Sequence, residues 1–257
     1  MTAVKGNDEG RVALTVRRGP AKGLRLELDL VHKHESAYAL GKYDNEILAS
    51  LVKLVQPGWT IWDVGTYLGF YSVFFSRLVG PQGVVVCIEP DPRNLARTRR
   101  NLELNGYGME NHLNAAIGGP AGEVDFLLNE DTNSHLPGVY VGDRGMKEVY
   151  RERDTGKKSL RVACITLDQA CFEKALPHPD LIKIDIEGAE LVALRHLDRL
   201  CKEVRPILLL ELHNPECDAE AWAFGTRTGY RLTRAEDGLA ITDASQVRGT
   251  LLCFPPK

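Results

Sequence analysis

Apolar and polar residues alternate near the start of the chain and then shift to helical spacing. The segments VALTV and LRLEL, within residues 11–30, flank a stretch with two glycines and a proline, so they predict a β-hairpin. Residues 44–55 carry apolar side chains three and four positions apart, which predicts an amphipathic helix with Asp44 as its N-cap. We therefore expect residues 1–56 to form a hairpin and a helix that pack on a larger core.

Short apolar runs alternate with amphipathic segments through the rest of the chain, residues 57–257. Strands are predicted at residues 60–64, 84–88, 112–117, 181–186 and 207–212. Helices are predicted at residues 70–79, 92–104, 188–203 and 217–226. This order predicts an α/β fold with a doubly wound, Rossmann-like, mostly parallel sheet of seven strands. Its last two strands, at 229–234 and 251–254, are expected to form an antiparallel edge.

The regular alternation is interrupted by an insertion after the third strand, at about residues 118–180. Strands are expected within it at residues 123–128 and 160–166. The segment between them is polar, and residues 143–161 hold seven basic and four acidic side chains without helical periodicity. A surface loop or lid is typical of such a pattern, and we expect residues 129–161 to close over a substrate.

Composition and charge narrow the classes of protein that remain. The 257 residues include 32 basic and 35 acidic side chains, and a net charge of −3 does not suit a protein that coats nucleic acid or an anionic membrane. No apolar run approaches the roughly 18 residues that span a bilayer, and no secretory signal is recognisable, so a cytoplasmic protein is expected. The six cysteines are scattered without a C-x-x-C pair, which excludes a zinc ribbon or a disulfide framework.

The sharpest chemical signal follows the strand at residues 60–64. Asp63 and Gly65 end that strand and Gly69 begins the next helix, so the turn leaves room for a ligand beside free N–H groups. The dinucleotide fingerprint G-x-G-x-x-G would need a glycine where Tyr67 stands. The carboxylate of Asp63 would also repel a pyrophosphate, whereas it would favour a ligand with an ammonium group.

Residues at the ends of two further strands suit the same ligand. Glu89 follows the second core strand, where an acid can accept both hydroxyl groups of a ribose. Asn114 and Ala115 lie near the end of the third strand, where a purine ring would be bound. A carboxylate for an amine, a carboxylate for ribose and a slot for adenine together describe S-adenosylmethionine, which is the expected cofactor.

A second group of ionisable residues lies at the ends of the later strands. Asp185 and Glu187 follow the fourth core strand, and Glu211 and His213 follow the fifth, so all four should lie at the cofactor edge of the sheet. We predict His213 or Asp185 as the base that accepts a hydroxyl proton, with Glu187 orienting the hydroxyl or the base. The alternatives are a structural histidine, and acids that, like Glu190, favour the positive end of the next helix. The four groups could hold a divalent cation, but no ligand spacing demands one and none is expected.

These motifs resemble the FkbM-type family of S-adenosylmethionine-dependent methyltransferases over about residues 41–214. Residues 63–72, D-V-G-T-Y-L-G-F-Y-S, are similar to the family's D-V-G-A-N-x-G-x-Y-S, and residues 183–190, K-I-D-I-E-G-A-E, match its K-I-D-V-E-G-A-E closely. The resemblance implies the class I methyltransferase fold. Tyr67 stands where the family has Asn, so it is expected to stack on or shield the cofactor. Together with the residues above, the predicted cofactor site comprises Asp63, Gly65, Tyr67, Gly69, Tyr71, Ser72, Glu89, Pro90, Asn94, Asn114, Ala115 and Asp185.

The resemblance also implies the reaction, namely O-methylation of a hydroxyl on a sugar or other small molecule of bacterial secondary metabolism. The expected partner is a small hydroxyl acceptor such as a sugar, a glycolipid or an antibiotic precursor, and His135 is a further candidate for its site. A homodimer is left open. No nucleic-acid partner is expected, because the arginines of the helix at 92–104 are interpreted as a solvated face.

Three alternatives remain for the function. A nicotinamide-dependent oxidoreductase is disfavoured by Tyr67 and Asp63 at the glycine turn. A nucleic-acid base methyltransferase usually carries an Asn/Asp-Pro-Pro-aromatic run where residues 185–188 read D-I-E-G. The third alternative is a module that holds the cofactor without catalysis.

Overall fold

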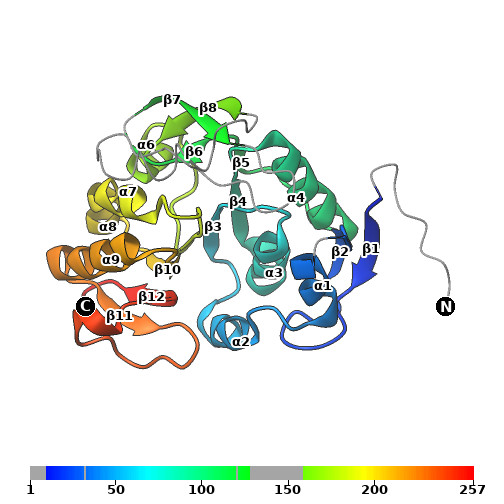
Figure 1. Ribbon diagram of the computed structural model, residues 1–257, viewed down its shortest axis with the longest axis horizontal. Helices are drawn as coiled ribbons and strands as arrows, with labels where there is room; N and C mark the ends of the chain where they lie inside the picture. The colour runs from blue at the N-terminus through cyan, green and yellow to red at the C-terminus, as the bar shows by residue number, and fades with distance from the viewer. Residues whose placement is uncertain (1–9, 32, 120, 128–158) are drawn as a thin grey trace.

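Short apolar runs form the central sheet of the protein (Figure 1). The structure is a computed structural model that describes residues 10–31, 33–119, 121–127 and 159–257. Seven strands lie in the order β11-β12-β10-β9-β3-β4-β5. Their bounds are β3 (Thr60–Val64), β4 (Val84–Ile88), β5 (His112–Leu113), β9 (Leu181–Ile184), β10 (Ile207–Glu211), β11 (Arg231–Arg234) and β12 (Thr250–Phe254). β10, β9, β3, β4 and β5 pair in parallel, which confirms the predicted doubly wound sheet.

The last two strands, β11 and β12, form the antiparallel edge that we expected. β12 pairs antiparallel with both β10 and β11, so it lies inside the sheet and β11 forms the edge. Leu251 and Cys253 of β12 are fully buried. An apolar strand of this kind needs a neighbour on each side, whereas β11 carries the exposed Arg231 and tolerates the edge.

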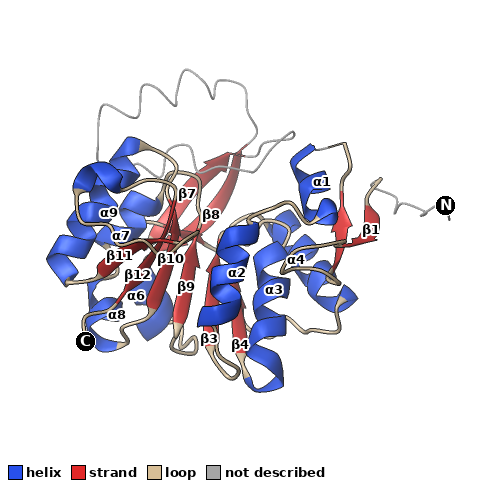
Figure 2. Cartoon of the chain, turned by 90° about the horizontal axis from the view of Figure 1, so that it is seen from below, coloured by secondary structure: helices blue, strands red, loops and turns tan. Residues whose placement is uncertain are grey.

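Helices cover both faces of the sheet (Figure 2). One face is covered by α2 (Asn45–Leu54), α3 (Phe70–Val79) and α4 (Pro92–Leu104), and the other by α6 (Leu167–Phe172), α7 (Glu190–Arg195), α8 (Asp198–Glu203) and α9 (Pro215–Thr228). Adjacent residues of one strand point to opposite faces of the sheet. Leu209 of β10 belongs to the buried cluster on the α2, α3 and α4 face, and Leu208 and Leu210 belong to the cluster on the other face. Two short 3₁₀ turns, η1 (Gly80–Gln82) and η2 (Ala244–Gln246), lie in the connections and bury no residue.

The predicted helix at 188–203 is two helices, α7 and α8. The backbone N–H groups of Arg199 and Leu200 donate to the carboxylate of Asp168, at 3.2 and 2.8 Å. This remote carboxylate satisfies the first turn of α8, so a new helix begins after the fully buried Leu197. Periodicity alone could not reveal the break, because the apolar spacing continues across it.

The N-terminal unit packs on the α3 and α4 side of the sheet. It holds the predicted hairpin of β1 (Val12–Thr15) and β2 (Arg25–Leu28), and also α1 (Lys33–Leu40), which the sequence analysis missed. α1 has no clear apolar stripe, because the residues it buries include the carboxylate of Glu35. Asp44 is the N-cap of α2 as predicted, but its side chain does not cap the N–H groups of the first turn. Its backbone is left-handed, with φ 48°, and its carboxylate accepts a hydrogen bond from the Tyr71 hydroxyl at 2.8 Å.

The third predicted strand and the insertion form a second, smaller sheet. The strand at 112–117 divides into β5 and β6 (Ala116–Ile117), and β6 joins β7 (Gly122–Leu127) and β8 (Ser159–Ile165) in the order β6-β8-β7. Most of the predicted lid, including His135, lies outside the described residues, and residues 159–161 belong to β8. All six cysteines are buried free thiols. Among the described helices, none combines the length and apolar character needed to cross a membrane.

Candidate functional site

A cavity opens at the carboxyl ends of β3, β4 and β9. Ligand sites of doubly wound sheets lie at this edge. Eight of the predicted cofactor residues line the cavity, namely Gly65, Tyr67, Tyr71, Glu89, Pro90, Asn94, Ala115 and Asp185. Glu187 lines it as well. The predicted residues that do not line it are Asp63, Gly69, Ser72, Asn114 and His213.

The glycine turn after β3 is shaped by close approach of two strand ends. Gly65 and Gly69 both have φ 83°, which glycine adopts without strain. A Cβ on Gly65 would overlap the carbonyl oxygen of Asp185, so no other residue fits there without movement of β3 or β9. Tyr67 and Glu187 are non-glycine residues with φ of 50° and 55° on the facing turns. Left-handed backbone at such residues is concentrated at functional sites.

Glu89 is held at the end of β4 by backbone donors. Its Oε2 accepts the N–H of Tyr67 at 2.9 Å and its Oε1 accepts the N–H of Asp91 at 3.0 Å. Burial raises the pKa of Glu89 to about 7, although both hydrogen bonds act to lower it. Asn114 braces the same turn, because its Nδ2 donates to the carbonyl oxygens of Glu89 and Pro90 at 2.8 and 2.9 Å. Each oxygen of Glu89 can accept a second hydrogen bond, so it can still receive a hydroxyl group.

Asp63 lies beneath the cavity rather than in its wall. The carboxylate is fully buried, and its Oδ2 accepts the Ser72 hydroxyl at 2.5 Å. Its Oδ1 has no hydrogen-bond partner within the described part of the chain and lies 3.9 Å from Nζ of Lys183. Burial raises the pKa of Asp63, and the charge of Lys183 opposes that effect. The geometry therefore gives Asp63 a partner within the protein, a lysine ammonium, at the position where we predicted a ligand's ammonium.

Tyr67 connects the cavity to the N-terminal unit. Its hydroxyl donates to Oε1 of Glu35 at 2.8 Å, and Arg97 lies 2.8 Å from Oε2 of the same carboxylate. The Arg97 guanidinium also lies 5.3 Å from the centre of the Tyr67 ring. Arg97 is 9% exposed, so the interpretation of its helix as a wholly solvated face was wrong at this position. No pattern in the sequence predicts this partnership, because Glu35 and Arg97 are 62 positions apart.

Aromatic rings form part of the wall of the cavity. Tyr38 lies 4.4 Å from Tyr43 and 4.7 Å from Phe70, measured between ring centres, and all three line the cavity. The ring of Tyr71 lies 4.7 Å from the ammonium of Lys183. Flat apolar surfaces of this kind suit a ligand that combines ring faces with polar groups.

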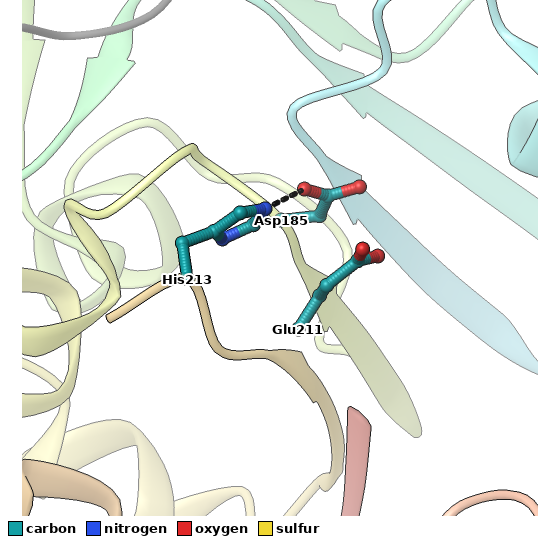
Figure 3. A group of neighbouring side chains, drawn as sticks. All are labelled: Asp185, Glu211 and His213. Atoms are coloured by element: carbon teal, nitrogen blue, oxygen red, sulfur yellow. Dashed lines mark ion pairs between the residues drawn. The ribbon is translucent and has the colours of Figure 1, made fainter. Parts of the chain in front are cut away.

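Asp185 joins the cavity to His213 (Figure 3). Its Oδ2 accepts Nζ of Lys183 at 2.8 Å, and its Oδ1 lies 3.6 Å from Nε2 of His213. Oε2 of Glu187 lies 3.6 Å from the same nitrogen. Burial would lower the pKa of His213, but the hydrogen bond with Glu190 and the charges of Glu190, Glu187 and Asp185 raise it to about 9. The predicted base thus contacts both acids of the cavity wall.

Glu211 completes a group that could hold a divalent cation. Ligand atoms of Asp185, Glu211 and His213 lie within 4.8 Å of one another (Figure 3). Carboxylate and imidazole groups are suitable ligands for several metals. Burial and the charge of Asp185 raise the pKa of Glu211 to about 7, whereas Lys183 lowers it. Positive charge is already present in the group, because the Lys183 ammonium pairs with Asp185.

The sequence matches a known family over most of the core domain. A family profile described as "Methyltransferase FkbM domain" matches residues 63–237. This range contains the glycine turn, Glu89, Asp185 and His213, so the match covers the strand ends that line the cavity but not Tyr38 and Tyr43 of its aromatic wall.

Several known proteins are similar to part of this chain at low sequence identity. "Methyltransferase 1" of Beauveria bassiana is 25% identical over 189 residues, which cover 68% of this chain and 69% of that protein. "Hexuronic acid methyltransferase AglP" of Haloferax volcanii is 21% identical over 170 residues, 66% of this chain and 62% of that protein. A crystal structure of methyltransferase FkbM from Methylobacillus flagellatus aligns with a TM-score of 0.48 and 16% identity. That alignment covers 82% of this chain and 53% of the Methylobacillus flagellatus chain, so this chain spans about half of that protein's length.

Proposed function

Because the chain belongs to the FkbM methyltransferase family, we propose that it transfers a methyl group from S-adenosylmethionine to a hydroxyl oxygen of a sugar or other small secondary metabolite. The observation that carries this proposal is the contact between Asp185 and His213 at the wall of the cavity. A proton acceptor is what a hydroxyl nucleophile needs beside a cofactor site. The relative whose name states a hexuronic acid as its substrate supports a sugar acceptor.

The chemistry of the cavity fits S-adenosylmethionine. Glu89 would accept the hydroxyl groups of the ribose, and the apolar side chains of Ile88 and Ala115 would contact the adenine. The carboxylates of Asp185 and Glu187 suit a ligand that carries positive charge. When bound, the cofactor supplies a methyl carbon that its sulfonium group activates for attack.

The acceptor oxygen loses its proton as it forms the new bond to carbon, and we assign that proton to His213 or Asp185. A positioned base of this kind contributes about 10²- to 10⁴-fold to the rate. With a pKa of about 9, His213 is mainly protonated at pH 7. A cation in the adjoining cavity would lower that pKa because like charges repel, and would so prepare His213 to accept a proton. Glu187 would orient the base, because its Oε2 lies 3.6 Å from Nε2 of His213.

The first test is calorimetric titration with S-adenosylhomocysteine, with NAD as the competing ligand class. We expect micromolar binding of S-adenosylhomocysteine and none of NAD. Glu89→Gln keeps the shape of the side chain but removes its charge, and it should weaken binding at least about tenfold. Glu103→Gln, on the exposed face of the neighbouring α4, is the matched control and should bind as the wild type does. Binding of NAD alone, or of neither ligand, would refute the proposal.

The second test is a panel of methyl acceptors, with release of S-adenosylhomocysteine as the signal. The panel contains neutral sugars, uronic acids, hydroxylated aglycones and transfer RNA. Methylation of a hydroxyl in any of the small molecules supports the proposal. Methylation of the RNA alone would replace it with the nucleic-acid alternative. Binding of the cofactor with no turnover on any acceptor class would favour the binding module.

A further inference from the structure

Glu190 is a fully buried carboxylate at the start of α7. It does not simply face the end of its own helix. Its Oε1 accepts the N–H of Ile186 at 2.9 Å, and its Oε2 accepts the N–H of Gly188 at 3.0 Å. These donors belong to the turn that carries Glu187 into the cavity wall, so Glu190 fixes the shape of that turn.

The same carboxylate contacts His213. Oε1 of Glu190 lies 3.1 Å from Nδ1 of the imidazole. Because a carboxylate can only accept, the hydrogen of this bond lies on Nδ1. In the neutral ring, Nε2 is then the nitrogen with the free lone pair, and it is the nitrogen that faces Asp185 and Glu187. A neutral histidine without such a partner would be free to carry its hydrogen on Nε2 instead.

We propose that Glu190 is a positioning residue, which fixes the tautomer and the ring orientation of His213 so that Nε2 receives the acceptor's proton. Its part in turnover rests on the proposed function. During transfer, the acceptor O–H bond breaks, its proton moves to Nε2, and Nδ1 keeps its hydrogen bond to Glu190 throughout. A carboxylate behind the imidazole stabilises the cation that results.

The charged groups around His213 come from several elements. Glu190 belongs to α7, Asp185 and Glu187 to the turn after β9, and Glu211 to the end of β10. From α9, the thiol of Cys217 lies 3.2 Å from Oε2 of Glu190. The acids together support the pKa of about 9 for His213, and the hydrogen bond that the imidazole donates to Glu190 has the largest part among the effects that raise it.

The test is an NMR titration of the ¹⁵N-labelled histidine side chains, with His213→Asn used to assign the signal. We expect the neutral form of His213 to carry its hydrogen on Nδ1 and to titrate near pH 9. In Glu190→Gln the midpoint should fall by at least one pH unit. Glu220→Gln is the matched control, because Glu220 is also buried but pairs with Arg195, away from the cavity. It should leave the midpoint and the tautomer unchanged.

Two outcomes would overturn the inference. One is an Nε2–H tautomer in the wild type, and the other is an unchanged midpoint in a folded Glu190→Gln protein. If that variant does not fold, the wild-type tautomer alone decides. The tautomer and the titration midpoint are measured without an acceptor. Failure of the calorimetric and acceptor tests would therefore refute the proposed methyl transfer and leave the structural part of this inference standing. With an acceptor, Glu190→Gln should move the pH dependence of kcat/KM to lower pH and reduce its plateau at least tenfold.

Discussion

Replacing Arg97 by methionine should lower the free energy of unfolding by about 3–5 kcal/mol. The guanidinium lies 2.8 and 3.0 Å from the two oxygens of Glu35, and the two side chains are 9% and 0% exposed. Without Arg97, the buried charge of Glu35 would keep two donors among the described residues, the Asp29 N–H and the Tyr67 hydroxyl. An uncompensated buried charge is costly because protein replaces the water that would solvate it.

Urea unfolding measures the effect, and the chain offers a matched control on the same helix. With a slope of roughly 1–3 kcal/mol per molar urea, the midpoint should fall by at least about 1 M. Arg100 also joins α4 to β2, at 3.6 Å from Glu27, but it is 59% exposed, so Arg100→Met should cost less than about 1 kcal/mol. The double variant Glu35→Leu with Arg97→Met should recover much of the loss. Equal effects of the two single arginine variants would refute the reasoning.

Three further results are expected. Gly65→Ala should lower the free energy of unfolding by more than about 2 kcal/mol, because overlap with the Asp185 carbonyl adds to the strain of a left-handed backbone. The control is Gly58→Ala, where φ is 87° and the space around the Cβ is open, so this variant should show the backbone strain alone. Calorimetric melting measures both variants. Below pH 7 the Kd of S-adenosylhomocysteine should rise up to tenfold per unit, because the pKa of Glu89 is about 7 and protonation removes the acceptor of the ribose hydroxyls; a flat pH profile would contradict this. Turnover should persist in EDTA, because the Lys183 ammonium already supplies positive charge beside Asp185, Glu211 and His213 (Figure 3). A loss of turnover that one divalent metal restores would show instead that these residues hold a metal needed for the reaction.

The parallel strands and their helices could be predicted from sequence because each depends on local pattern. The uninterrupted run at Val84–Ile88 and the proline-initiated helix after Asp91 form where the spacing placed them. The position of β12 between β10 and β11 was beyond such reasoning, because a strand's neighbours depend on the whole sheet. The break before α8 was missed for a similar reason, since the group that caps it, Asp168, lies 32 positions away from Leu200.

The cavity could be predicted in outline, because ends of parallel strands meet at one edge. Glu89, Asp185 and Glu187 line it as that rule implies. The rule does not say which way a strand-end side chain turns, and Asp63 turns toward Lys183 rather than into the cavity. Glu35 could not be foreseen at all, because it lies in a helix without a recognisable pattern.

The adjacency of β3 and β9 has a consequence for how the protein is made. Ile61 of β3 pairs with Leu181 of β9, 120 positions later, and Gly65 meets Asp185 at the end of that pairing. Closing so long a loop is entropically unfavourable, so contacts of this kind form late during folding. A nascent chain that has emerged only as far as β8 lacks β9. The edge of β3 would then be unpaired, and the glycine turn would lack the contact with Asp185. A ligand could not stabilise the chain at that stage, because its site would still lack the side that β9 and Asp185 supply, and the exposed strand edge would be open to wrong pairing.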